Sequence, residues 1–182
     1  MLNIIFPFFV HQSVTYLVMV LVLTLRQLHQ VILSFATNPI MRNRHLVCSF
    51  RCWPVDIDIF MHMNNSSYSR IAELATWRHL RCLGFLSTAV NNGWALVVTE
   101  QTITYLRSIR PFQRYEVLTS FKMEDDKFLQ CRQVFCQHPD DVKSGSEAKQ
   151  FAIVERKGVI KDRNGMTIRS NQFLVDINKY FS

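Results

Sequence analysis

The amino-acid sequence predicts an α+β domain that follows an apolar N-terminal segment. Three observations lead to this prediction: a stretch rich in β-forming residues at 45–53, a helical periodicity from Asn65 to Gly84, and four further stretches of β-branched and aromatic residues. One strand, one long helix and then four strands is an order typical of α+β domains. The chain has 182 residues, enough for one such domain and an appendage.

The helix is expected to begin near Asn65, because apolar residues recur behind it at the spacing of one helix face. These residues are Tyr68, Ile71, Ala72, Ala75, Leu80 and Leu83. Gly84 follows them, and glycine is common directly after a helix end. We expect this to be the one long helix of the domain, with Tyr68, Trp77 and Leu80 in the core.

Four strands are expected after a turn at 91–93. Their ranges are Trp94–Arg107, Arg114–Glu124, Lys127–Gln137 and Glu147–Arg156. Asp125 and Asp126 form a tight turn between the second and the third of them. Residues 157–165 are expected to form a terminal hairpin or loop. With the strand at 45–53, the sequence predicts a sheet of about five strands.

Residues 1–36 are expected to be a membrane anchor or signal-anchor in front of a domain at 37–182. Large apolar residues dominate 4–25, which is close to the roughly 20 residues that cross a bilayer. No Lys or Arg precedes Arg26, and positive flanks stay cytoplasmic. We therefore expect a cytosolic domain, at the endoplasmic reticulum if the chain is eukaryotic. The alternative is a signal cleaved near Ala36 and a secreted domain.

The net charge of +7 favours an anionic partner. Because the basic residues are scattered and no nucleic-acid motif is visible, we expect no nucleic acid, and a phosphate-bearing ligand or a membrane face is the better interpretation. The five cysteines lack the paired spacing of a zinc site. We expect reduced, mostly buried thiols, and neither a metal nor a cofactor.

One stretch, from Asp56 to Tyr68, combines carboxylates, an imidazole, two carboxamides and two hydroxyls directly before the predicted helix. Asn and Ser are favoured helix N-caps, and a helix N-terminus offers free N–H groups to a negative or polarised oxygen. A carboxylate a few residues upstream lies beside whatever the helix end holds. The stretch therefore indicates an acid or base next to an oxyanion hole.

The same residues resemble the signature of hot-dog-fold acyl-CoA thioesterases. The matching residues are Trp53-Pro54-Val55-Asp56-Ile57-Asp58, His62-Met63-Asn64-Asn65 and Tyr68. The nearest resemblance is to the branch around thioesterase superfamily member six and its bacterial relatives, over roughly 45–160. It implies an antiparallel sheet wrapped around one helix, a homodimer or larger assembly, and acyl-CoA or a related acyl thioester as ligand.

The resemblance implies roles for the residues of the motif. Asp58 matches the catalytic Asp, ten residues before Tyr68, and would act as base or nucleophile; the alternative is an Asx-turn residue that shapes the loop. His62 positions Asp58 or the thioester, or only caps the loop. Asn64, Asn65 and Ser66 form the helix end that holds the oxyanion, with Asn65 among the catalytic residues.

Other residues are weaker candidates. Arg107, Arg110 and Arg114 could bind the phosphates of coenzyme A, or form a solvated turn. Glu100 is a backup acid, on a strand expected to border the pocket. For Asp56 we expect a structural or surface role.

Two departures favour a second interpretation. Phe60 and Ser108 stand where the plant acyl carrier protein thioesterases have polar groups, so that network is incomplete. The leading prediction is an acyl-CoA thioesterase-like enzyme, and the alternative is a non-catalytic, membrane-tethered hot-dog protein that binds acyl-CoA or acts as a scaffold.

Overall fold

The computed structural model describes residues 20–21, 24–25, 28, 40–42 and 45–169. The chain divides into two units, Met1–Thr37 and Asn38–Ser182. In the first unit the described residues are helical. Most of the predicted anchor at 4–25, and the boundary between residues 36 and 37, lie outside the described residues. No helix in the described part of the chain is both long and apolar enough to cross a bilayer.

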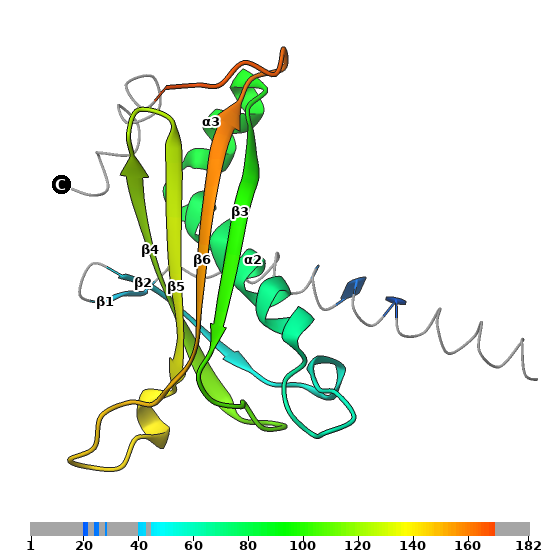
Figure 1. Ribbon diagram of the computed structural model, residues 1–182, viewed down its shortest axis with the longest axis vertical. Helices are drawn as coiled ribbons and strands as arrows, with labels where there is room; N and C mark the ends of the chain where they lie inside the picture. The colour runs from blue at the N-terminus through cyan, green and yellow to red at the C-terminus, as the bar shows by residue number, and fades with distance from the viewer. Residues whose placement is uncertain (1–19, 22–23, 26–27, 29–39, 43–44, 170–182) are drawn as a thin grey trace, which may run out of the picture. The chain divides into compact units, whose positions relative to one another are not determined.

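The second unit contains one antiparallel sheet in the order β1-β2-β4-β5-β6-β3 (Figure 1). Its strands are β1 (Ile40–Arg42), β2 (His45–Arg51), β3 (Ala95–Tyr105), β4 (Arg114–Glu124), β5 (Phe128–Gln137) and β6 (Gln150–Lys161). Two α-helices and two short 3-10 helices join them: η1 (Pro54–Asp56), α2 (Asn65–Cys82), α3 (Phe85–Asn92) and η2 (Pro139–Asp141). The five predicted strands are present, with the three-residue β1 in addition.

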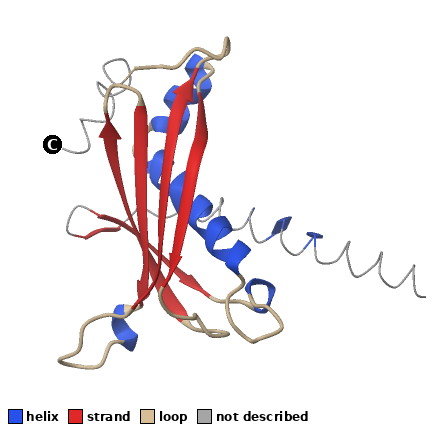
Figure 2. Ribbon diagram, in the orientation of Figure 1, coloured by secondary structure: helices blue, strands red, loops and turns tan. Residues whose placement is uncertain are grey.

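Helix α2 packs against one face of this sheet (Figure 2). Its buried residues Ile71, Ala72 and Ala75 belong to the same core cluster as Val117 of β4 and Phe135 of β5. A long helix covered by an antiparallel sheet is the α+β hot-dog arrangement that the resemblance implies. The fold prediction is confirmed for this part of the chain.

The structure contains a second helix that the sequence prediction missed. Gly84 ends α2 as expected, with φ of +72°, but it is also the residue before α3. Residues 85–92 include Ser, Thr and two Asn, which favour turns. Phe85 and Ala89 nevertheless share one helix face and pack with Leu80 and Ile160 in a second core cluster. Tertiary packing here overrides a weak local preference.

The last strand, β6, continues to Lys161, where the sequence predicted a hairpin or loop from Lys157. Glycine inside a strand usually argues against the strand. At Gly158 the reason is close approach, because a Cβ there would lie 2.9 Å from the carbonyl oxygen of Val97 on β3. The short strand β1, which was not predicted from the sequence, pairs with β2.

Candidate active site

Asp58 closes a short loop with its own carboxylate. Its Oδ1 accepts hydrogen bonds from the backbone N–H groups of Phe60 (2.9 Å) and His62 (3.4 Å), and its backbone N–H donates to the His62 carbonyl oxygen at 2.9 Å. This is an Asx turn. Asp58 is half-buried and His62 is exposed. The second carboxylate oxygen, Oδ2, accepts no hydrogen bond from residues 45–169.

The same loop occurs a second time, at Asp162. Its Oδ1 accepts from the backbone N–H groups two and four residues later, at 2.9 and 2.8 Å, and its own N–H donates to the Met166 carbonyl oxygen at 2.9 Å. The residue three positions after the aspartate has a left-handed backbone conformation in both loops: Met61 has a φ of 60° and Gly165 a φ of 78°. The turn by itself therefore shows only how the loop is formed. What distinguishes Asp58 is the helix that follows.

The loop leads into the N-terminus of α2 through a short antiparallel pairing. Ile57 bridges Met63, and the Asn64 N–H donates to the Asp56 carbonyl oxygen at 2.7 Å. Met63 is buried and Ile57 packs against the main core. This anchoring sets Asp58 at the entrance to α2.

Asn64 is the N-cap of α2, as predicted. Its Oδ1 accepts from the Ser66 backbone N–H at 2.9 Å and from the Ser66 hydroxyl at 2.8 Å. The Ser66 N–H is therefore occupied. The N–H of Asn65 makes no hydrogen bond to the described residues. It is a free donor at the positive end of an 18-residue helix.

Asp56 has the structural role expected of it, but it is interior and not at the surface. Its side chain is 0% exposed. Its Oδ2 accepts from the Trp53 N–H at 2.9 Å, and its Oδ1 forms an ion pair of 2.8 Å with Arg70 of α2. The two neighbouring acids of the motif thus differ in environment: Asp56 fixes the loop to the helix, and Asp58 keeps one oxygen available.

The loop from Leu106 to Gln113 lies against the Asp58 loop. The Met63 N–H donates to the Ile109 carbonyl oxygen at 2.9 Å, and the Phe112 N–H donates to that of Cys52 at 2.7 Å. Two of the predicted phosphate-binding residues, Arg107 and Arg110, are exposed on this loop.

The third, Arg114, is engaged elsewhere. It forms ion pairs of 3.1 Å with Asp140 and 2.7 Å with Asp141, and the hydrogen bond to Asp141 raises its pKa. The structure therefore brings two of the three arginines next to the Asp58 loop.

Glu100 does not line the space between helix and sheet. It follows a bulge in β3 and lies opposite Lys157 in the sheet register. Its side chain lines a separate pocket of about 380 Å³ with residues such as Thr102, Arg132 and Glu155, and Arg156 borders this pocket as well as the one beside α2. Ser108 and Phe60 are both exposed. Glu100 thus lies in a different pocket from the one that α2 borders.

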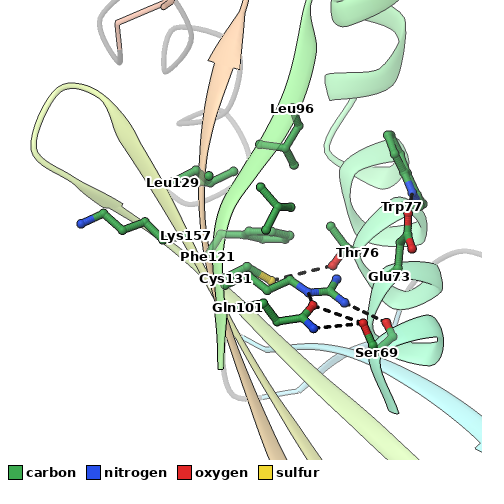
Figure 3. A pocket seen from close by; sticks show the side chains of 13 residues that line it. Ser69, Glu73, Thr76, Trp77, Leu96, Gln101, Phe121, Leu129, Cys131 and Lys157 are labelled. Atoms are coloured by element: carbon green, nitrogen blue, oxygen red, sulfur yellow. Dashed lines mark hydrogen bonds between the residues drawn. The ribbon is translucent and has the colours of Figure 1, made fainter. Parts of the chain in front are cut away.

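A pocket of about 270 Å³ lies between α2 and the sheet. Figure 3 shows Ser69, Thr76 and Trp77 on the helix side, facing strand residues such as Leu96 and Leu129. Trp77, predicted to be a core residue, instead lines this pocket and is partly exposed. Tyr68 and Leu80 are buried as expected.

A model of the thioesterase-like superfamily matches residues 52–172, from the Asp58 loop through α2 and strands β3 to β6. The chain belongs to the thioesterase-like superfamily. It is a thioesterase-like hot-dog protein.

Individual relatives agree with this assignment. The chain is 35% identical to Protein THEM6 from Xenopus laevis over 117 residues, which are 64% of this chain and 54% of that protein. It thus spans about half the length of that relative. Two solved structures share the fold. One is the probable thioesterase YbaW from Escherichia coli, with a TM-score of 0.64, 17% identity, and coverage of 73% of this chain and 98% of that one. The other is Slr0204, a 1,4-dihydroxy-2-naphthoyl-CoA thioesterase from Synechocystis, with a TM-score of 0.63, 13% identity, and coverage of 76% and 98%.

Sequence reasoning missed the polar side of the pocket in this thioesterase-like domain. It consists of Arg156 on β6, Gln101 on β3 and Ser69 on α2. A signal was present: in β6 every second residue from Ala152 faces the helix, and Arg156 interrupts that otherwise apolar or small row. The predicted strand ended at Arg156, so the position did not read as an interior one.

Proposed function

We propose that the domain hydrolyses acyl-CoA thioesters, with Asp58 as the catalytic carboxylate and the Asn65 N–H as the oxyanion donor. The observation that supports this proposal is a pair of polar groups at the entrance to α2 that make no hydrogen bond to the described residues. Asp58 has a carboxylate oxygen without a hydrogen bond to the described residues, and Asn65 has a backbone N–H without one.

The chemistry follows from these two groups. The Asp58 carboxylate takes a proton from a water molecule, and the water oxygen attacks the thioester carbonyl carbon. The negative charge that develops on the carbonyl oxygen is stabilised by the Asn65 N–H and the positive end of α2. When the tetrahedral intermediate collapses, the C–S bond breaks. The thiolate of coenzyme A takes the proton, and a carboxylic acid is released.

Two further proposals concern the ligand. Arg107 and Arg110 are exposed cations on the loop bonded to the Asp58 loop, so they are positioned to bind phosphate groups of coenzyme A outside the acyl pocket. His62, opposite Asp58, is exposed and is proposed to orient Asp58 or the thioester.

The test is free-thiol release by the full-length chain in detergent, with acyl-CoAs from acetyl to stearoyl. Asp58→Asn keeps the shape of the side chain and removes the base, so we expect turnover to fall by roughly 10²–10⁴-fold. Asp162→Asn is the matched control, because Asp162 makes the same turn away from α2. We expect it to keep wild-type turnover.

The two variants also separate catalysis from loop building. If both lose activity equally, or if the wild type turns over no acyl-CoA, the assignment of Asp58 is wrong. Asp56→Asn is unsuitable as a control because that carboxylate is buried and ion-paired.

Hydrolysis in ¹⁸O-labelled water distinguishes the two possible roles of Asp58. A base leaves the protein unlabelled in a single turnover. A nucleophile forms an anhydride with the acyl group, and attack of water on the aspartyl carbonyl carbon of this anhydride leaves label in the Asp58 carboxylate. Label in Asp58 therefore excludes a role as base alone.

A second candidate function is non-catalytic binding of acyl-CoA. The Asp58 loop has the geometry of the Asp162 turn, and Phe60 and Ser108 lack the polar groups of the plant-type network. This function requires acyl-CoA binding by the wild type with no thiol release, and equal binding by Asp58→Asn.

A further inference from the structure

Arg156 is a buried cation in a row of side chains that faces α2. The residue is 8% exposed. Its neighbours in that row of β6 are Val154, Gly158 and Ile160. Val154 belongs to the main core cluster and Ile160 to the second one. Arg156 and Gly158 therefore stand between the two clusters, at positions where apolar side chains would join them. The pocket occupies this gap.

The hydrogen bonds of Arg156 go to neutral acceptors. Its Nε donates to Oε1 of Gln101 at 2.7 Å, and one terminal nitrogen donates to the backbone carbonyl oxygen of Ser69 at 2.7 Å. Gln101 in turn donates to the Ser69 hydroxyl at 3.1 Å. A guanidinium has five N–H donors in a fixed fork. The network fixes its orientation and leaves donors for another acceptor.

Within the described residues Arg156 forms no ion pair. Glu73 of α2 lines the same pocket and interacts favourably with its charge, but Glu73 is exposed and accepts from the Trp77 indole at 3.4 Å. Burial lowers the pKa of Arg156, the direction expected of a cation taken from water without a buried counter-ion. Such a cation is costly to the fold, so its position requires another explanation.

The walls of the pocket suit an aliphatic chain. Leu96, Phe121, Leu129 and Trp77 line it (Figure 3). Arg156 is the cation with the greatest burial among its lining residues. Lys157, the other cation there, forms an ion pair with Glu124 at 2.6 Å. An apolar ligand with one anionic oxygen group would match this distribution of polarity.

We propose that this pocket binds the acyl part of the ligand and that Arg156 binds a carboxylate on it, so that the preferred ligands are short acyl groups that carry a carboxylate at the far end. The proposal rests on the proposed acyl-thioester function. A charged hydrogen bond to a carboxylate is worth about 1.5–3 kcal/mol, which is about 10–100-fold in affinity. The volume of about 270 Å³ lies just below the usual range for drug-sized ligands, consistent with a short chain.

Binding is measured rather than turnover, so that the result does not depend on catalysis. Hexanoyl-CoA and adipoyl-CoA differ only in the terminal carboxylate, and calorimetric titration of the full-length Asp58→Asn protein avoids their hydrolysis. We expect adipoyl-CoA to bind at least tenfold more tightly than hexanoyl-CoA. Arg156→Met, added to that background, should abolish the preference and leave hexanoyl-CoA binding within about threefold.

Arg132→Met is the matched control. Arg132 directly follows the pocket residue Cys131 in β5, so its side chain lies on the opposite, outer face of the sheet. There it is paired with Glu155 at 3.2 Å. It removes the same charge without touching the pocket, and the preference for adipoyl-CoA should remain. Glu73→Gln should strengthen adipoyl-CoA binding, because it removes a competing carboxylate.

Free hexanoate tests whether Arg156 binds a carboxylate at the far end of the acyl group or the carboxylate that hydrolysis produces. If Arg156→Met weakens hexanoate binding but leaves adipoyl-CoA unaffected, Arg156 binds the product of hydrolysis and the far-end assignment is wrong. Equal affinities of wild type and Arg156→Met for all three ligands would overturn the proposal completely.

Thermal unfolding without ligand tests whether Arg156 supports the fold instead of binding a ligand. We expect Arg156→Met to unfold at or above the wild-type temperature, because a buried cation is replaced by an apolar side chain. A clearly lower temperature would mean that the hydrogen bonds to Gln101 and Ser69 support the fold, and would count against a ligand site. If thiol release is absent but the Arg156-dependent preference is found, the hydrolysis proposal fails and this one stands.

Discussion

Arg70 and Asp56 form an ion pair of 2.8 Å in which the Asp56 side chain is completely buried and the Arg70 side chain is 22% exposed. The pair joins the second turn of α2 to the segment just before Asp58. It therefore determines where the helix N-terminus lies relative to the loop, although neither residue faces the ligand in the proposed mechanism.

Removal of Arg70 is expected to destabilise the domain. Arg70→Met leaves the Asp56 carboxylate buried without its cation, which costs roughly 3–5 kcal/mol. Urea unfolding measures this difference. Arg110→Met removes an exposed arginine and should change stability by less than about 0.5 kcal/mol. Similar values for the two variants would mean that the ion pair contributes little.

The stability of the domain should decrease as the pH is lowered, because His79 is buried. Burial lowers the pKa of His79 to about 3 from 6.5. Between these values the unfolded chain binds a proton that the folded domain does not, so the free energy of unfolding decreases as the pH falls from about 6.5 towards 3. The slope from this residue is about 1.4 kcal/mol per pH unit. Arg78 lowers the pKa further.

His79→Gln tests this slope. The His79 Nε2 lies 3.3 Å from Cys48 Sγ, and glutamine can keep a hydrogen bond there without titrating. Urea unfolding from pH 7 to pH 4 should give a shallower decline for His79→Gln than for the wild type. His62→Gln, at an exposed position, should follow the wild type. Parallel curves for all three proteins would contradict the prediction.

The domain should be a homodimer or larger. β3 is an edge strand of eleven residues, and most of its side chains are exposed. A long unprotected edge is a template for pairing with another strand. Light scattering at micromolar concentration should show a dimer, and Val97→Lys in β3 should weaken it. Met166→Lys, in an exposed turn, is the control, and a stable wild-type monomer would exclude the dimer.

Residues 4–25 are expected to anchor the protein with its domain in the cytosol. The argument is the apolar composition of this segment and the positive flank behind it. Alkaline carbonate extraction should leave the full-length chain in the membrane pellet, and added protease should digest the domain in intact vesicles. Release into the supernatant would exclude an anchor. A protected domain would favour the lumen or secretion after cleavage near Ala36.

Periodicity was enough to predict α2 and the five long strands, because their apolar faces repeat over many residues. It failed where contacts distant in sequence decide the structure. α3 forms because Phe85 packs against residues such as Ile160, and β6 passes through Gly158 because β3 lies so close.

The candidate site shows the same division. The cap at Asn64 is a local hydrogen bond and could be predicted from the motif. The burial of Asp56 depends on Arg70, and the polar side of the pocket combines residues from α2, β3 and β6. Such combinations depend on the three-dimensional packing of elements and leave only indirect traces in the sequence.

The position of β6 in the sheet has a consequence for synthesis of the protein. β6 is the last of the described strands to leave the ribosome, yet it lies between β5 and β3. Until Lys161 has emerged, β3 lacks its partner in the sheet, and the core lacks Val154 and Ile160. Folding therefore cannot be completed in step with translation. A nascent chain that stalls before residue 150 lacks β6 between β5 and β3, and unpaired strand edges of this kind favour aggregation.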